Sequence, residues 1–155
     1  MRDKLINALL FQAGWFACVL DWLWLAALIL GVHILRHGQI RLLLSVMLFG
    51  TLLDSALTWL GVFDFSTGSQ WIPLWLMLLW ALLGTTLNHC LAWTAKPWWL
   101  GSLLGAVSGP LSYYAGAQLA GVGLPLGLWP SLLLLAAIWA VVLPLLHGLA
   151  RRVRG

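Results

Sequence analysis

Long runs of hydrophobic residues, separated by short polar segments, make up nearly the whole sequence. The clearest run, residues 42–61, contains only one ionisable residue, Asp54. A helix of about 20 mainly apolar residues is long enough to cross the ~30 Å hydrocarbon core of a bilayer. Comparable runs occupy residues 71–95, 98–119 and 129–149. This pattern predicts a polytopic bundle of transmembrane helices.

The first hydrophobic segment, residues 5–35, is too long for one span. A straight helix of this length would measure about 46 Å, and Asp21 interrupts the segment near its middle. We therefore expect two short helices here, whereas one continuous helix would reduce the spans to five. The chain is predicted to be one domain, 1–155, with six spans at about 5–20, 22–35, 42–61, 71–95, 98–119 and 129–149.

Composition supports the membrane class, because 63% of the residues are hydrophobic and 8% are charged, with a mean hydropathy of +0.99. The net charge of +4 arises from Lys and Arg in turns and at the termini. Such charges set orientation in a membrane and give no reason to expect nucleic acid as a partner. With six spans all eight Lys and Arg lie on one side, whereas five spans divide them six to two. The sequence thus predicts an all-α, multi-pass protein of the cytoplasmic membrane with both termini cytoplasmic.

Most of the twelve tryptophans lie near the predicted ends of spans, as expected for side chains that favour the membrane interface. Trp15, Trp80 and Trp139 are the exceptions, since they lie near the middle of their spans. An interfacial belt explains the tryptophan content better than an aromatic binding box does. A tryptophan at mid-membrane depth can nevertheless line a lipid pocket.

Asp54 is the first candidate for chemistry, because an ionisable side chain inside a membrane costs at least ~2.5 kcal/mol and normally faces a bundle interior or a wet cavity. Counting 1.5 Å per residue from the cytoplasmic ends places Asp54, Ser112 and Tyr113 at a similar depth of about 20 Å. Asp54, Tyr113 and His89 are the candidate catalytic residues. A structural role for Asp54 explains its position equally well.

A second polar level, about 10 Å deep by the same count, contains Gln12, Asn88 and His89. His89 is expected to be either a general base or a neutral group hydrogen-bonded to a neighbouring helix. At these depths His89 and Asp54 are too far apart for a direct hydrogen bond, so a catalytic pair would need a bridging water, a tyrosine or a bent helix. The candidates for ligand binding are Gln12, Asn88, Ser112 and Tyr114.

Signals for a cofactor or a metal are missing from the sequence. It contains no phosphate-binding glycine loop, nucleophile elbow or histidine-rich iron box. His33, His37 and His147 lie near predicted helix ends, and no pair has convincing zinc-ligand spacing. We therefore predict no cofactor and no metal site.

The fifth span carries a small-residue repeat, Gly101, Gly105 and Gly109, that allows close approach of another backbone. This backbone belongs either to another helix of the same chain or to a second copy in a homo-oligomer. Pro110 is expected to interrupt the helix, because proline removes a backbone donor and crowds the preceding turn. The hydroxyl groups of residues 112–114 either restore hydrogen bonds at the kink or serve a ligand.

Four segments occur together in a specific order: NALLFQAGWF (7–16), GTLLDS (50–55), TLNH (86–89) and GPLSYYAG (109–116). In combination they resemble a family of small bacterial inner-membrane proteins that is catalogued as a domain of unknown function. The resemblance covers most of the chain. It implies frequent gene neighbours that look like cyclopropane-fatty-acid-synthase-type methyltransferases and flavin-dependent oxidoreductases. It therefore implies membrane lipids and lipid-modifying enzymes as partners, and it carries over no catalytic residue.

The leading functional hypothesis is an integral membrane protein that binds or presents a lipid, as an accessory component of a fatty-acid or lipid modification system. An intramembrane acid–base enzyme that uses Asp54, His89 and Tyr113 on a lipid is the first alternative. A small proton-coupled transporter in which Asp54 titrates is the second.

Overall fold

The structure is a computed structural model and describes residues 1–154. This part of the chain is helical, which confirms the predicted all-α class. It contains six α-helices and one short 3-10 helix, η1: α1 (Arg2–Val19), α2 (Leu23–His37), α3 (Ile40–Trp59), α4 (Leu74–Leu87), η1 (Ala92–Ala95), α5 (Trp98–Ala120) and α6 (Leu128–Arg154).

The first hydrophobic segment forms two helices, as predicted from its length. The chain turns between α1 and α2 at Asp21, whose φ of 61° lies in the left-handed region. Aspartate tolerates this conformation better than most residues because its short polar side chain can bond locally. The Trp22 amide donates to the Ala17 carbonyl, which closes the turn. The split at Asp21 is therefore confirmed.

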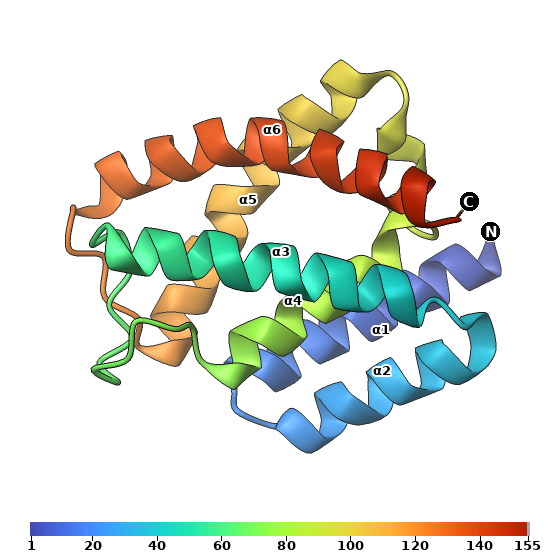
Figure 1. The fold of residues 1–155 in the computed structure, drawn as a ribbon, viewed down its shortest axis with the longest axis horizontal. Helices are drawn as coiled ribbons and strands as arrows, with labels where there is room; N and C mark the ends of the chain where they lie inside the picture. The colour runs from blue at the N-terminus through green and yellow to red at the C-terminus, as the bar shows by residue number, and fades with distance from the viewer. Residues whose placement is uncertain (155) are drawn as a thin grey trace.

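The helices run back and forth, and the two ends of the chain lie at the same end of the molecule (Figure 1). Helix α4 contacts α1, α2, α3 and α6, which makes it the central helix. Its sequence is apolar on all sides, as is typical of a helix surrounded by others. Helices α5 and α6 pack against each other along one side of the bundle.

The fourth helix is much shorter than the predicted span 71–95. It begins at Leu74, directly after Pro73, and ends at Leu87. Near this end the hydroxyl groups of Thr85 and Thr86 donate to the carbonyls of Leu82 and Leu83. Such bonds compete with helix continuation. The prediction of one continuous helix was wrong, and residues 88–91 form a turn before η1.

The predicted interruption at Pro110 was also wrong. Helix α5 continues through this proline from Trp98 to Ala120, and Pro110 itself is buried. Proline costs one backbone hydrogen bond, but packing against a neighbouring helix can offset that loss. Helix α5 has such a neighbour in α6.

The glycine repeat of α5 faces α6. A Cβ atom at Gly105 would overlap the backbone carbonyl of Trp139, and one at Gly109 would overlap the Trp139 side chain. Of the two uses predicted for the repeat, packing within the chain is the one that the structure supports.

Two helices are long and apolar enough to cross a membrane, judged by length and composition: Ile40–Trp59, which is α3, and Leu128–Val153 of α6. Helices α2 and α4 are apolar but shorter. Some membrane-spanning character is therefore supported, and the six-span topology stays a prediction.

Replacement of Gly105 by alanine should destabilise the fold, because the added methyl group would push α6 away from α5. Overpacking of this kind typically costs about 1–3 kcal/mol. Thermal unfolding of the purified protein in detergent would show a lower midpoint for Gly105→Ala. Gly31→Ala is the matched control, since nothing lies within 4 Å of that position and alanine favours the helix. Equal midpoints for both variants would contradict the close α5–α6 contact.

Candidate functional site

Asp54 lies at the centre of the molecule, and its side chain is fully buried. Two aromatic side chains donate hydrogen bonds to its carboxylate. The Trp80 indole nitrogen lies 2.7 Å from Oδ2, and the Tyr113 hydroxyl lies 2.9 Å from each of the two oxygens. The three residues belong to α3, α4 and α5, so this cluster joins three helices.

Local sequence features position the cluster. Gly50 lies one turn before Asp54, and a Cβ atom there would overlap the Trp80 indole, so only glycine leaves room for that ring. Aromatic stacking then fixes both donors. Trp139 stacks on Trp80 with ring centroids 5.4 Å apart, and Phe63 stacks on Tyr113 at 5.3 Å. Contacts of this type restrict ring orientation and add stability.

An elongated cavity of about 260 Å³ lies next to the cluster. Trp80, Tyr113 and Trp139 form part of its wall, so the Asp54 hydrogen bonds lie directly behind the lining. The rest of the wall is almost entirely apolar or aromatic. Its further lining residues include Phe11, Trp15, Val19, Phe63, Phe65, Trp75, Leu79, Leu83 and Val122.

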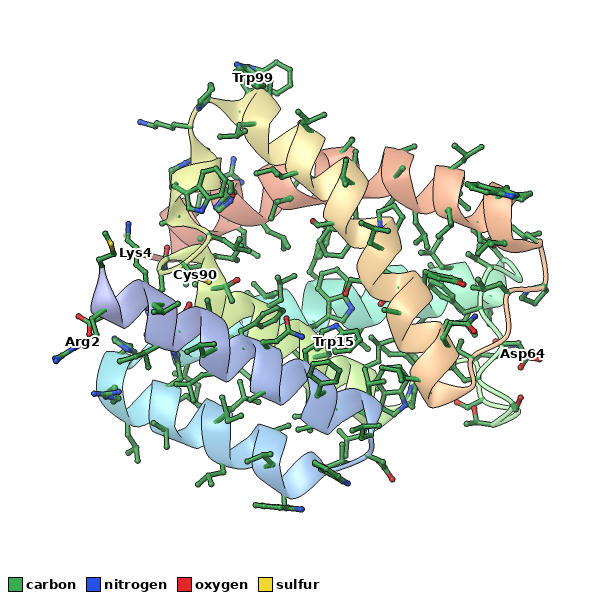
Figure 2. The ribbon with its side chains drawn as sticks, turned by 180° about the vertical axis from the view of Figure 1, so that it is seen from behind. Arg2, Lys4, Trp15, Asp64, Cys90 and Trp99 are labelled. Carbon is green, nitrogen blue, oxygen red and sulfur yellow. The ribbon has the colours of Figure 1, made fainter. Side chains whose placement is uncertain are left out.

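Part of the cavity wall is exposed at the surface, where α5 contacts α1. Ser108 and Ser112, one helical turn apart on α5, line the cavity and are also exposed. Trp15 of α1 lies opposite them, and its indole nitrogen donates to the Ser112 hydroxyl at 3.0 Å. Figure 2 shows Trp15 on the C-terminal half of α1, the part that lies towards α5. An apolar ligand could therefore enter from the side.

Two loops meet near one end of the cavity. Asp64 and Gly123 exchange two backbone hydrogen bonds, of 3.0 and 2.8 Å, which tie the α3–α4 loop to the α5–α6 loop. The neighbouring Phe63, Phe65 and Val122 side chains line the cavity. This backbone pairing holds the aromatic residues of the first loop in place.

The structure brings together some of the predicted site residues. Asp54 and Tyr113, predicted at one depth, are in direct contact, and Ser112 lines the adjoining cavity. Gln12 and Tyr114 are exposed and are not among the cavity lining. Asn88 and His89 lie in the turn after α4, where His89 is next to His33 and His37.

The three mid-membrane tryptophans, Trp15, Trp80 and Trp139, all line the cavity. Sequence reasoning missed Phe11, Phe63 and Phe65. Of these, Phe11 could have been found, because it shares one helical face with Trp15 and Val19 at intervals of four residues. The two loop phenylalanines carry no such periodic signal.

The chemistry available at this site is limited by its lining. Asp54 offers only a carboxylate, which lies behind the cavity wall. The polar side-chain groups that line the cavity itself are those of Ser108, Ser112, Tyr113 and the tryptophan indoles. One carboxylate without further charged ligands is a poor metal site. The arrangement fits an apolar ligand with at most one or two hydrogen-bonding groups.

Comparison with known families gives one result. The family model described as "Protein of unknown function (DUF2878)" matches residues 4–145. The chain belongs to this family. No curated protein and no solved structure matches it. Since the DUF2878 description states no activity, the function of this chain has to be argued from its own residues.

Replacement of Tyr113 by phenylalanine should lower stability, because it removes one of the two hydrogen-bond donors to the buried Asp54 carboxylate. Leaving a buried polar group short of a partner costs about 1–3 kcal/mol, and more for a charged one. Chemical unfolding in mixed micelles would measure this loss. Tyr114→Phe provides the control, since that side chain is exposed and adjacent in sequence. Equal stability of the two variants would contradict a structural role for the Tyr113 hydroxyl.

Proposed function

We propose that this chain is a six-span cytoplasmic-membrane protein that binds a lipid chain in the cavity beside Asp54. In this proposal it is an accessory component of a fatty-acid or lipid modification system and holds one hydrocarbon chain of a membrane lipid. The observation that carries the proposal is an aromatic, nearly apolar cavity whose wall includes the exposed residues Ser108 and Ser112 of α5, and we infer that it opens sideways there, between α1 and α5.

The outer surface of the helices supports a membrane environment. Leu44, Leu48 and Leu52 form a stripe along α3, and each is more than half exposed. An equivalent stripe on α5 comprises Leu103, Val107 and Leu111. Soluble proteins rarely expose continuous apolar surfaces of this extent, whereas lipid covers them without cost.

The two ends of the molecule support the predicted orientation. Arg2 and Lys4 lie at the end where α1 begins, and Asp64 lies at the opposite end (Figure 2). The α2–α3 connection lies at the same end as the termini (Figure 1), with Arg36 in the last turn of α2 and Arg41 in the first turn of α3 beside it. A concentration of basic residues at one end is the expected signature of the cytoplasmic side.

Cavity size and position favour a lipid over a small polar ligand. At about 260 Å³ the cavity is slightly smaller than the ~300–1,000 Å³ typical of pockets for drug-sized molecules. A lipid chain would therefore be held only in part, with the remainder in the bilayer. The opening between α1 and α5 lies beside the exposed apolar stripe of α5, where membrane lipid would be available.

An intramembrane acid–base enzyme is a second candidate, favoured by one observation. Tyr113 lines the cavity and also donates a hydrogen bond to Asp54, so a pair of groups able to transfer a proton adjoins the cavity. His89 packs against His33 and His37 and does not line the cavity. The enzyme hypothesis therefore uses Asp54 and Tyr113 alone. The transporter hypothesis needs Asp54 to exchange protons, although its side chain is fully buried.

The six-span topology predicts which loops can be labelled from outside the cell. In a background with Cys18→Ser and Cys90→Ser, a membrane-impermeant maleimide should label Ser69→Cys in intact cells. Arg152→Cys should be labelled only after lysis, because it lies next to the cytoplasmic C-terminus. Labelling of both positions in intact cells, or of neither, would contradict the topology.

Narrowing the opening should weaken lipid binding. Ser108→Trp places a large side chain at the cavity mouth, and the lost hydroxyl bonds only to the Leu104 carbonyl of its own helix. Photo-crosslinking with a diazirine-bearing fatty acid in nanodiscs should fall by about tenfold, which corresponds to ~1.4 kcal/mol. Val107→Trp, at an exposed neighbouring position outside the lining, should label like wild type.

The accessory role is tested separately by lipid analysis of cells that lack the gene. Mass spectrometry should reveal a missing or accumulating lipid species that wild-type protein restores. Asp54→Asn preserves size while removing the charge, so failure to restore the species by a variant that accumulates in the membrane and unfolds like wild type would place Asp54 in the working mechanism. An unchanged lipid profile in the deletion strain would count against the accessory role, even if crosslinking showed binding.

A further inference from the structure

Three histidines from two parts of the chain meet away from the cavity. His33 and His37 lie one helical turn apart on α2, and His89 lies in the turn that follows α4. Their ring centroids are 4.8 Å apart for His33 and His37, 5.3 Å for His33 and His89, and 4.4 Å for His37 and His89. One ring nitrogen from each residue can be chosen so that all three lie within 4.8 Å of one another.

The burial of this histidine cluster differs from residue to residue. His33 is buried, His89 is half-buried and His37 is exposed. The Nε2 atom of His33 has no hydrogen-bond partner among the described residues. A buried polar atom without a partner is costly and needs an explanation, such as a ligand that completes its bonding. The Gln39 side chain lies beside His33 and can orient its ring.

We propose that His33, His37 and His89 bind a divalent transition metal ion, with Zn²⁺ as the best match. Imidazole nitrogen is a preferred zinc ligand, whereas Mg²⁺ and Ca²⁺ select oxygen. Three histidines with a fourth position open to water form a recurrent zinc coordination set. The exposed side of the cluster, at His37, leaves room for that fourth ligand.

The geometry needs only side-chain adjustment to reach coordination. Nitrogens bound to a tetrahedral zinc at about 2.0–2.1 Å lie about 3.3 Å from one another. The ligand atoms are now within 4.8 Å, so rotations of the exposed His37 and the half-buried His89 can close the gap. Two histidines at positions i and i+4 on one helix present their nitrogens on the same face, which suits a shared metal.

Position in the fold suggests what the metal does. It would link the last turn of α2 to the turn after α4, which is not part of a regular helix. None of the three histidines lines the lipid cavity. The metal site is therefore independent of the lipid-binding proposal, and either one can fail alone.

Metal binding is tested on the full chain, purified in detergent without a polyhistidine tag. Equilibrium dialysis against ZnCl₂ and elemental analysis should give one zinc per chain for the wild type. His37→Ala should weaken zinc binding by at least about tenfold while leaving the fold intact, because this side chain is exposed. His89→Ala should have a similar effect. His147→Gln, outside the cluster, should bind zinc like wild type.

Co²⁺ provides a readout of geometry as well as affinity. Wild-type protein loaded with CoCl₂ should show the intense visible absorption of a tetrahedral site, and zinc should displace it. His33→Ala should abolish this absorption, and circular dichroism would check that this variant still folds. Absence of stoichiometric zinc in the wild type, or unchanged binding in both His37→Ala and His89→Ala, would overturn the proposal.

Discussion

The structure depends above all on the satisfaction of one buried carboxylate. Asp54 is fully enclosed, and the two hydrogen-bond donors that reach it come from α4 and α5. An unsatisfied charged or polar group at this position would cost several kcal/mol. The requirement therefore fixes how these two helices lie against α3. Gly50 contributes to this arrangement, since any side chain there would displace the Trp80 indole that donates to Asp54.

The same requirement explains why a cavity persists in a bundle that could otherwise pack more tightly. Trp80 and Tyr113 must keep their polar atoms pointed at Asp54, and each is held flat by a stacked aromatic partner. Rigid rings locked in this way cannot rotate to fill the neighbouring space. Protein interiors normally leave few voids larger than a water molecule. A cavity of about 260 Å³ is therefore unusual, and it marks the place where a ligand would complete the packing.

Much of the fold could be predicted because hydrophobic run lengths determine how many helices form. The separation of α1 from α2 followed from length and from Asp21, and counting residues along helices placed Asp54 and Tyr113 at one level. Counting residues along a predicted span misleads where the helix ends before the predicted end of that span. Helix α4 stops at Leu87 because of local threonine hydrogen bonds, a short-range effect that hydropathy does not register. We attribute the continuity of α5 through Pro110 to its packing against α6. Rules based on local sequence do not include such tertiary contacts.

The histidine cluster was missed for a related reason. Depth counting orders residues along the membrane normal, but it does not determine which helices are lateral neighbours. His37 lies at the end of α2, whereas an uninterrupted fourth helix would have kept His89 deeper in the membrane. The early end of α4 and the contact between α2 and α4 bring the two rings within 4.4 Å. A metal-ligand pattern divided between two segments leaves no recognisable spacing in the sequence.

The turn after α4 also bears on the membrane topology. With 14 residues α4 is about 21 Å long, less than the hydrocarbon thickness, so under the proposed six-span topology the turn and η1 would complete the crossing. Irregular backbone at membrane depth is tolerated only where protein or water satisfies it. Asn7 of α1 meets this need, since it donates to the Thr85 carbonyl and accepts from the Cys90 amide. These two hydrogen bonds of Asn7 hold the turn that carries His89 against α1.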